Sequence, residues 1–200
     1  MKIGILGGAF NPIHIGHLLM GERAYETFGL DEVWFMPNGG PPHKDERVSK
    51  DDFEHRISML DLATKAVSYF SISLKEAKLD TASYSYSTLN SLKREFPDTQ
   101  FYFILGADSL FAIEKWVCFE EIFSSCIILA AKRDDKDDKN MNEQIEYLAK
   151  EYGARIELLK TPLIEISSSD IRNRVKNGLS ISYMTTEKVI DYIEKNRLYR

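Results

Sequence analysis

The sequence is poor in the residues that mark several large classes of protein. Its 200 residues include only two cysteines, Cys118 and Cys126, which do not form a Cys-x-x-Cys motif. A chain of this length needs no disulfide staples, so we expect two free thiols in a reducing cytoplasm. Eleven glycines and six prolines are too few for a collagen-like or low-complexity chain. No apolar run reaches the roughly 18 residues of a membrane span, so we expect no membrane association.

Positive charge is scarce as well. Lysine and arginine number 26 against 31 aspartates and glutamates, which gives a formal net charge of -5. This balance argues against nucleic-acid binding, which needs a basic face. An anionic substrate would have to be captured by a local group of donors, because the overall field repels it. The charged run at 133–139 is typical of a solvated surface loop.

The hydrophobic pattern alternates between short apolar strands and helices. Continuous apolar strands separated by helices predict a parallel sheet covered on both faces, which is a doubly wound α/β fold. We expect one domain, 1–200, whose C-terminal part from about 166 to 200 is helical. The expected strands are 2–7, 32–36, 70–74, 100–105, 127–131 and 155–159; the expected helices are 17–28, 51–66, 85–96, 107–114, 119–124, 140–152, 168–177 and 184–196.

A glycine-rich turn, from Gly7 to His17, follows the first expected strand. It is neither a dinucleotide-binding fingerprint nor a P-loop, because the required glycine spacing and the Gly-Lys-Ser/Thr end are missing. The turn opens a helix, whose free N–H groups favour an anion. His14 and His17 are three residues apart, so both could donate hydrogen bonds to phosphate oxygens from one face. A metal-binding pair is the less favoured alternative, because no His-Glu-x-x-His pattern or cysteine cluster completes such a site.

A second polar motif, from Ile166 to Arg172, precedes a helix near the C-terminal end. Three consecutive serines and Asp170 predict a helix cap. Three hydroxyls exceed what one cap uses, and Arg172 lies one turn further on. Hydroxyls, helix N–H groups and a guanidinium together suit a polyphosphate.

Taken together, the His-x-Gly-His turn and the Ile-Ser-Ser-Ser-x-Ile-Arg motif resemble the HxGH nucleotidyltransferase superfamily. Within it the chain is similar to the bacterial nicotinate-nucleotide adenylyltransferases. The chain departs from the family pattern at Ala9, Asn11 and Ser85, and it lacks the usual Pro-Gly after Arg133. Further segments that carry the resemblance are 34–38, 41–44, 55–56, 83–85, 106–109, Trp116 and 189–199.

The resemblance implies a Rossmann-like nucleotidyltransferase fold and a cytoplasmic enzyme of NAD biosynthesis. Such an enzyme transfers AMP from ATP to nicotinate mononucleotide and forms deamido-NAD and pyrophosphate. Mg²⁺ is expected to arrive with ATP, with no metal ligands from the protein. The sequence does not determine the oligomeric state and is compatible with a homodimer.

The resemblance also implies roles for particular residues. It makes His14 and His17 the catalytic pair, with His17 acting on the transition state. It implies that nicotinate mononucleotide is bound by Asn38, Lys44, Tyr84, Ser85 and Trp116. It implies that ATP is bound by Gly7, Gly8, Ala9, Phe10, Gly106, Asp108, Ser109, Arg133, Ile166, Ser167, Ser168, Ser169 and Arg172.

Two other hypotheses about the function remain. The first is another HxGH nucleotidyltransferase, either a pantetheine-phosphate adenylyltransferase or a cytidylyltransferase. The Pro-Pro-His-Lys segment at 41–44, the Gly-Ala-Asp-Ser segment at 106–109 and Trp116 argue against it. The second is a nucleotide-binding regulator that has lost turnover. Retention of both histidines, Lys44 and Arg172 argues against that reading.

Overall fold

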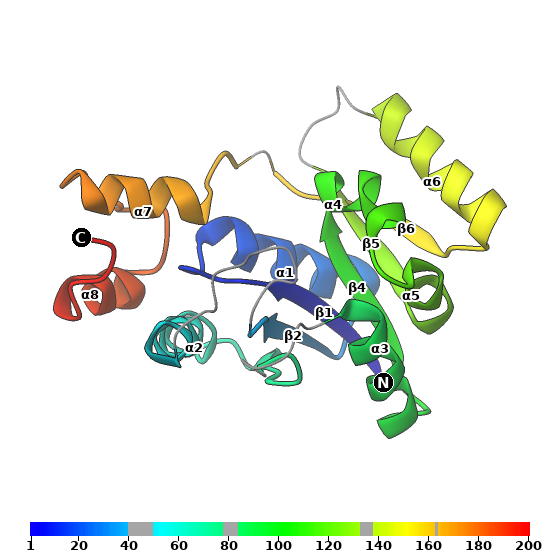
Figure 1. Cartoon of the computed structure of the whole chain (residues 1–200), viewed down its shortest axis with the longest axis horizontal. Coiled ribbons are helices and arrows are strands. Elements are labelled where there is room, and N and C mark those ends of the chain that lie inside the picture. Colours follow the sequence, from blue (N-terminus) through cyan, green and yellow to red (C-terminus); the bar gives the residue numbers. More distant parts are fainter. Residues whose placement is uncertain (40–49, 78–83, 133–137, 163) are drawn as a thin grey trace.

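The described part of the chain folds around one parallel sheet. The computed structural model describes residues 1–39, 50–77, 84–132, 138–162 and 164–200. Within them, six strands pair in the order β3-β2-β1-β4-β5-β6 (Figure 1). This order makes two halves that meet between β1 and β4, where open sheets of this kind bind ligands. The strands are β1 (Lys2–Gly8), β2 (Glu32–Pro37), β3 (Phe70–Ile72), β4 (Gln100–Gly106), β5 (Ile127–Lys132) and β6 (Ile156–Lys160).

Helices cover both faces of the sheet and divide the core in two. One core includes residues of α1 (Ile15–Phe28), α2 (Lys50–Thr64), α7 (Ser168–Lys176) and α8 (Glu187–Lys195). In Figure 1 α2, α7 and α8 gather at one side of the molecule, with the C-terminus among them. The other core is formed with α3 (Ser85–Glu95), α4 (Ala107–Phe111), the 3-10 turn η1 (Ile113–Lys115), α5 (Phe119–Ser125) and α6 (Asp138–Tyr152).

Strand β4 shows why the sequence gives a sheet buried on both faces. Phe101, Phe103 and Leu105 point into one core, whereas Tyr102 and Ile104 point into the other. Successive side chains of a strand point to opposite faces, so a strand covered twice must be apolar at every position. This explains the unbroken apolar run that predicted the strand.

The predicted doubly wound α/β fold is confirmed, and each expected element is found to within a few residues. Several boundaries differ, as three examples show. The strand expected at 70–74 ends at Ile72, the helix expected at 107–114 is divided into α4 and η1, and the last helix begins at Glu187. In the described residues, no helix is long and apolar enough to cross a membrane.

Candidate active site

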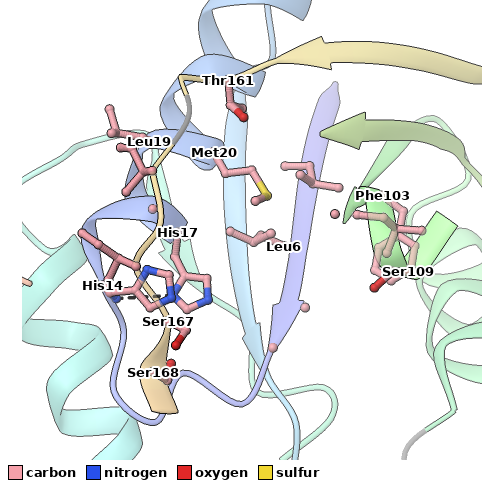
Figure 2. A pocket seen from close by; sticks show the side chains of 18 of the residues that line it. Leu6, His14, His17, Leu19, Met20, Phe103, Ser109, Thr161, Ser167 and Ser168 are labelled. Atoms are coloured by element: carbon pink, nitrogen blue, oxygen red, sulfur yellow. Dashed lines mark hydrogen bonds between the residues drawn. The ribbon is translucent and has the colours of Figure 1, made fainter. Parts of the chain in front are cut away.

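A cavity of about 490 Å³ opens at the carboxyl ends of β1 and β4, where the strand order changes direction. Figure 2 shows the two histidines and the serines of α7 grouped on one side, with Phe103 and Ser109 on the other. The cavity therefore brings together segments more than 150 residues apart. The predicted site residues that line it are Gly7, Gly8, His14, His17, Asn38, Ser85, Gly106, Ser109, Trp116, Ile166, Ser167 and Ser168.

The loop between β1 and α1, residues 9–14, turns sharply beneath the cavity. Phe10 adopts a left-handed backbone with φ 47°, which costs a bulky residue about 1–3 kcal/mol. Burial of its ring offsets this cost, because Phe10 is 1% exposed in the core. The ring meets that of His17 edge to face, with centroids 5.1 Å apart. The Phe10 side chain thus supports His17 from behind, and any contact of Phe10 with a nucleotide must come from its backbone.

The two histidines form a stacked pair at the start of α1. Their ring centroids lie 3.6 Å apart, and the backbone N–H of His14 donates to Nδ1 of His17 over 3.3 Å. A ring nitrogen that accepts a hydrogen bond carries no proton, so the neutral His17 ring holds its proton on Nε2. His17 is therefore arranged to donate one hydrogen bond from Nε2. His14 is the N-cap residue of the helix, one position before its first residue, Ile15.

Steric crowding explains why the third residue of the His-x-Gly-His turn is a glycine. A Cβ atom at Gly16 would lie 3.1 Å from Cε1 and Nδ1 of His14. That is tighter than ordinary van der Waals contact, so any other residue would displace the ring. Gly16 thus permits the stacking of His14 on His17.

Helix α7 presents its N-terminus to the same cavity. Ser167 caps the helix, as predicted, by accepting from the backbone N–H of Asp170 over 3.1 Å, and its hydroxyl also lies 2.9 Å from that of Ser169. The hydroxyl of Ser168 donates to the carbonyl oxygen of Pro12 over 2.8 Å. The serine motif therefore has two functions in the fold: it starts α7, and it holds the β1–α1 loop against that helix.

Arg172 also contacts the β1–α1 loop. Its Nη1 donates to the carbonyl oxygen of Asn11 over 2.7 Å. That bond uses one of the five guanidinium N–H groups and fixes the position of the charge beside the loop. Arg172 does not line the cavity itself, so its positive charge acts on the site across the β1–α1 loop.

Two aromatic residues, Phe103 and Trp116, also line the cavity. Trp116 is half-buried, and its ring meets Phe103 with centroids 6.4 Å apart. Asn38 and Ser85 line the cavity as well. Sequence reasoning missed two polar residues that line the cavity, Thr161 and Glu76. Burial raises the pKa of the Glu76 carboxyl above the ordinary value, and a hydrogen bond with Thr88 opposes that shift. No sequence signal marks Glu76, because it stands in a mixed charged stretch.

The remaining predicted residues fall into two groups. Among the described ones, Asp108 is exposed in the first turn of α4, and Tyr84 is 38% exposed just before α3. Ala9, Phe10, Asp108, Ser169, Arg172 and Tyr84 border the site without lining the cavity. Lys44 and Arg133 lie outside the described residues.

The donor set of the cavity suits phosphate oxygens. No lysine or arginine is among the described residues that line it, and the first turn of α1 holds no acidic residue. Among the described lining residues, positive potential therefore comes from the helix N-termini, and the imidazoles add hydrogen-bond donors. The described residues contain no group of three or more histidines, cysteines, aspartates or glutamates able to hold a metal. These residues fit Mg²⁺ only as an ion carried by a bound triphosphate.

Comparison with known proteins agrees with this geometry. The model of a family described as cytidylyltransferase-like matches residues 5–174. The fold, the His-x-Gly-His turn and this match define the chain as a nucleotidyltransferase of that family. Relatives from Lachnoclostridium phytofermentans and Carboxydothermus hydrogenoformans, both named probable nicotinate-nucleotide adenylyltransferase, are 46% and 41% identical. These matches cover 99% and 100% of this chain and 98% of each relative. The chain belongs to the nicotinate-nucleotide adenylyltransferase family.

Solved structures support the fold. Nicotinic acid mononucleotide adenylyltransferase of Plasmodium falciparum, complexed with NaAD, matches with a TM-score of 0.79 and 23% identity over 99% of this chain and 97% of its own. The same protein complexed with APC matches with a TM-score of 0.77 and 24% identity, over 99% and 96% of the two chains.

Proposed function

We propose that the protein transfers the AMP group of ATP to nicotinate mononucleotide, with deamido-NAD and pyrophosphate as products. The observation that carries the proposal is the shared cavity, which joins the N-terminal ends of α1 and α7 to the aromatic residues Phe103 and Trp116. The names of the full-length relatives support the choice of substrates. We propose further that the whole chain, 1–200, is one catalytic domain that acts in the cytoplasm, where its two free cysteines would stay reduced.

The site suits this reaction because the attacking group needs no general base. The phosphate of a mononucleotide has a second pKa near 6, so it is already largely ionised at neutral pH. Its oxygen attacks the α-phosphorus of ATP, and the bond to the β-phosphate oxygen breaks to release pyrophosphate. What the protein must supply is alignment and compensation of negative charge. A neutral His17 that donates from Nε2 meets that need without taking up a proton.

The charged phosphates would be held from three directions. The N-terminus of α1 faces the cavity, the serines of α7 supply hydroxyl and backbone donors, and Arg172 adds positive charge behind the loop. Mg²⁺ bound to the triphosphate would neutralise part of its negative charge. Lys44 and Arg133 are proposed to add positive charge at the acceptor phosphate and at ATP respectively.

The pyridine ring would occupy the aromatic side of the cavity. Trp116 offers a face on which a planar ring can stack, and Asn38 and Ser85 offer hydrogen-bonding groups beside it. We propose Tyr84 as a wall of the same pocket, since it directly precedes Ser85.

One acceptor screen tests the proposal. Purified protein is incubated with Mg²⁺ and labelled ATP, and each reaction contains one acceptor: nicotinate mononucleotide, its amide analogue, phosphopantetheine or a polyol phosphate. We expect labelled deamido-NAD and an equal amount of pyrophosphate with the first acceptor. Transfer to phosphopantetheine alone, or to no acceptor, would refute the proposal. CTP in place of ATP separates a cytidylyltransferase in the same experiment.

A further inference from the structure

Arg56 is a buried cation at the edge of the cavity, and it holds two loops at once. It lies on α2 and is only 2% exposed. Its Nη1 donates to the carbonyl oxygen of Ala9 over 2.7 Å, and its Nη2 donates to that of Asn38 over 2.9 Å. Ala9 begins the β1–α1 loop that leads to the histidines, whereas Asn38 directly follows β2 and lines the acceptor side. One rigid group therefore joins the nucleotide side of the cavity to the acceptor side.

Arginine is the residue type that this double contact requires. Its guanidinium is planar and offers donors in a fixed fork, so it can reach two carbonyl oxygens in one geometry. The lysine ammonium is a compact charge on a flexible stem and fixes no such angle. The guanidinium also lies over the ring of Phe53, 4.9 Å from its centroid. Burial lowers the pKa of Arg56, and the charge of Asp52 acts in the opposite direction.

A second contact links the same two segments. The backbone N–H of Asn38 donates to the carbonyl oxygen of Gly8 over 3.1 Å. The nucleotide side and the acceptor side thus meet at adjacent positions, and Arg56 covers the junction from the α2 side. A shift of one segment is transmitted to the other, because both carbonyls accept from the same guanidinium.

We propose that Arg56 is a positioning residue that couples the two substrate subsites, so that occupation of one changes affinity at the other. Coupling of this kind is a free energy shared by two sites, and it is reciprocal. The proposal rests on the proposed function, since that function assigns the β1–α1 loop to ATP and the Asn38 segment to nicotinate mononucleotide.

Calorimetry of the full chain tests the coupling directly. The Kd of nicotinate mononucleotide is measured with and without a saturating non-hydrolysable ATP analogue and Mg²⁺. We expect the analogue to change this Kd by about fivefold or more in the wild type. In Arg56→Lys the ratio should fall to within about twofold of unity. Loss of folded protein alone would not change the ratio, because Kd refers only to the fraction that binds.

Arg174→Lys is the matched control. The Nε of Arg174 also donates to a backbone carbonyl, that of Ser180, over 2.8 Å, but Arg174 is in the last turn of α7 and neither residue lines the cavity. We expect the control to keep the wild-type ratio. If Arg56→Lys does not fold, Arg56→Gln replaces it, and the wild-type ratio is informative on its own. A wild-type ratio of unity, or a ratio retained in the Arg56 variant, would overturn the proposal whatever happens to kcat.

Failure of the proposed function gives a different result. A wild type that binds neither ligand would refute both the assigned substrates and the coupling. A wild type that forms deamido-NAD but shows a coupling ratio of unity would refute the role of Arg56 alone.

Discussion

The two sides of the cavity differ in how the described residues hold them. In the β1–α1 loop, each of four backbone carbonyls accepts from a side chain of a distant segment. The donors to Ala9, Asn11, Pro12 and Ile13 are Arg56, Arg172, Ser168 and Thr185 respectively. On the acceptor side, Trp116 is half-buried and Tyr84 is 38% exposed.

This difference agrees with the roles that we propose for the two sides. Transfer of a nucleotidyl group requires an in-line approach to one phosphorus atom, and a small misplacement of donors reduces the rate steeply. A planar ring, by contrast, gains most of its affinity from burial and stacking, which tolerate small shifts. We therefore expect changes at the phosphate side to act on kcat and changes at the acceptor side to act on specificity and KM.

The strongest test of this contrast is His17→Ala. Loss of one donor aimed at the transition state typically lowers kcat by about 10²–10³-fold. Steady-state kinetics with both substrates should show this loss, with much smaller changes in either KM. His55→Gln is the control, because the His55 ring bonds to Tyr192 and does not line the cavity. A His17→Ala enzyme with wild-type kcat would remove His17 from the mechanism.

The acceptor side is tested by comparing nicotinate mononucleotide, which carries a carboxylate, with its nicotinamide analogue, which carries a carboxamide. We expect kcat/KM for nicotinate mononucleotide to exceed that for the nicotinamide analogue by at least ~10²-fold, because an analogue that leaves buried groups unpaired is strongly rejected. Trp116 should stack equally well on both rings and contribute no discrimination. Initial rates with each acceptor, measured at matched, subsaturating concentrations, give the ratio of the two kcat/KM values. Equal values would show a dual-specificity pocket and leave adenylyl transfer itself intact.

A smaller effect is expected from Gly16→Ala. The added methyl group would press on the His14 ring and shift it by a few tenths of an ångström. Because a displacement near 1 Å can cost about 10²-fold, we expect kcat to fall by about tenfold. Gly21→Ala on the same helix is a close control, since its Cβ would meet Phe35 at the same 3.1 Å. The control should lower the melting temperature and spare kcat; an equal loss of kcat in both would contradict our explanation of Gly16.

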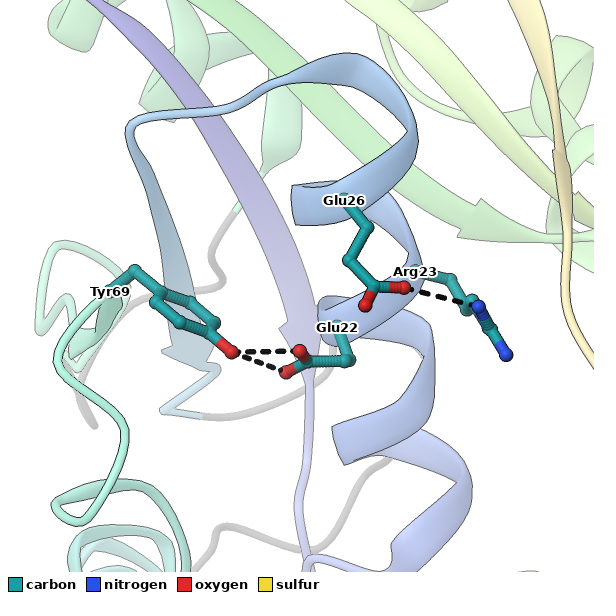
Figure 3. Close-up of polar contacts among 4 residues, drawn as sticks. All are labelled: Glu22, Arg23, Glu26 and Tyr69. Carbon is teal, nitrogen blue, oxygen red and sulfur yellow. Dashed lines mark hydrogen bonds and ion pairs between the residues drawn. The ribbon is translucent and has the colours of Figure 1, made fainter.

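The smallest effect on activity is expected at a region that belongs to neither side. The hydroxyl of Tyr69 donates to both carboxylate oxygens of Glu22, over 2.7 and 2.9 Å (Figure 3), and this bond raises the pKa of Tyr69 from 10 to about 12. The folded state thus holds the phenol proton more tightly than the unfolded state. The contribution to stability is complete below pH 10 and is lost as the pH rises toward 12.

Melting temperatures between pH 8 and pH 12.5 measure this contribution. Tyr69→Phe should flatten the decline above pH 10 and leave kcat at neutral pH unchanged. Tyr183→Phe, at a tyrosine that is 92% exposed, should behave as the wild type. A decline of unchanged steepness in Tyr69→Phe would assign the alkaline loss of stability to other groups, such as the buried thiol of Cys126, whose pKa burial raises to about 12.

The sheet and most helices could be predicted from the sequence because their signals are local. Continuous apolar runs and capping residues are visible within ten or so positions. The histidine and serine motifs were visible for the same reason. The partners of those motifs were not, since Arg56 meets Ala9 across 47 positions and Thr185 meets Ile13 across 172. Such contacts depend on how α2 and the C-terminal helices pack, which no local pattern specifies.

Residue 199 adds one more contact of this long-range kind. The Tyr199 hydroxyl lies 2.5 Å from Oδ1 of Asn11, 188 positions away, and burial raises the pKa of this tyrosine. During synthesis β1 leaves the ribosome first, yet the β1–α1 loop meets its partners at positions 168, 172, 185 and 199 only at the end. A growing chain can therefore pair its early strands while the β1–α1 loop still lacks most of its partners. Catalytic competence should appear late, as a final docking step of α7, α8 and the tyrosine behind them.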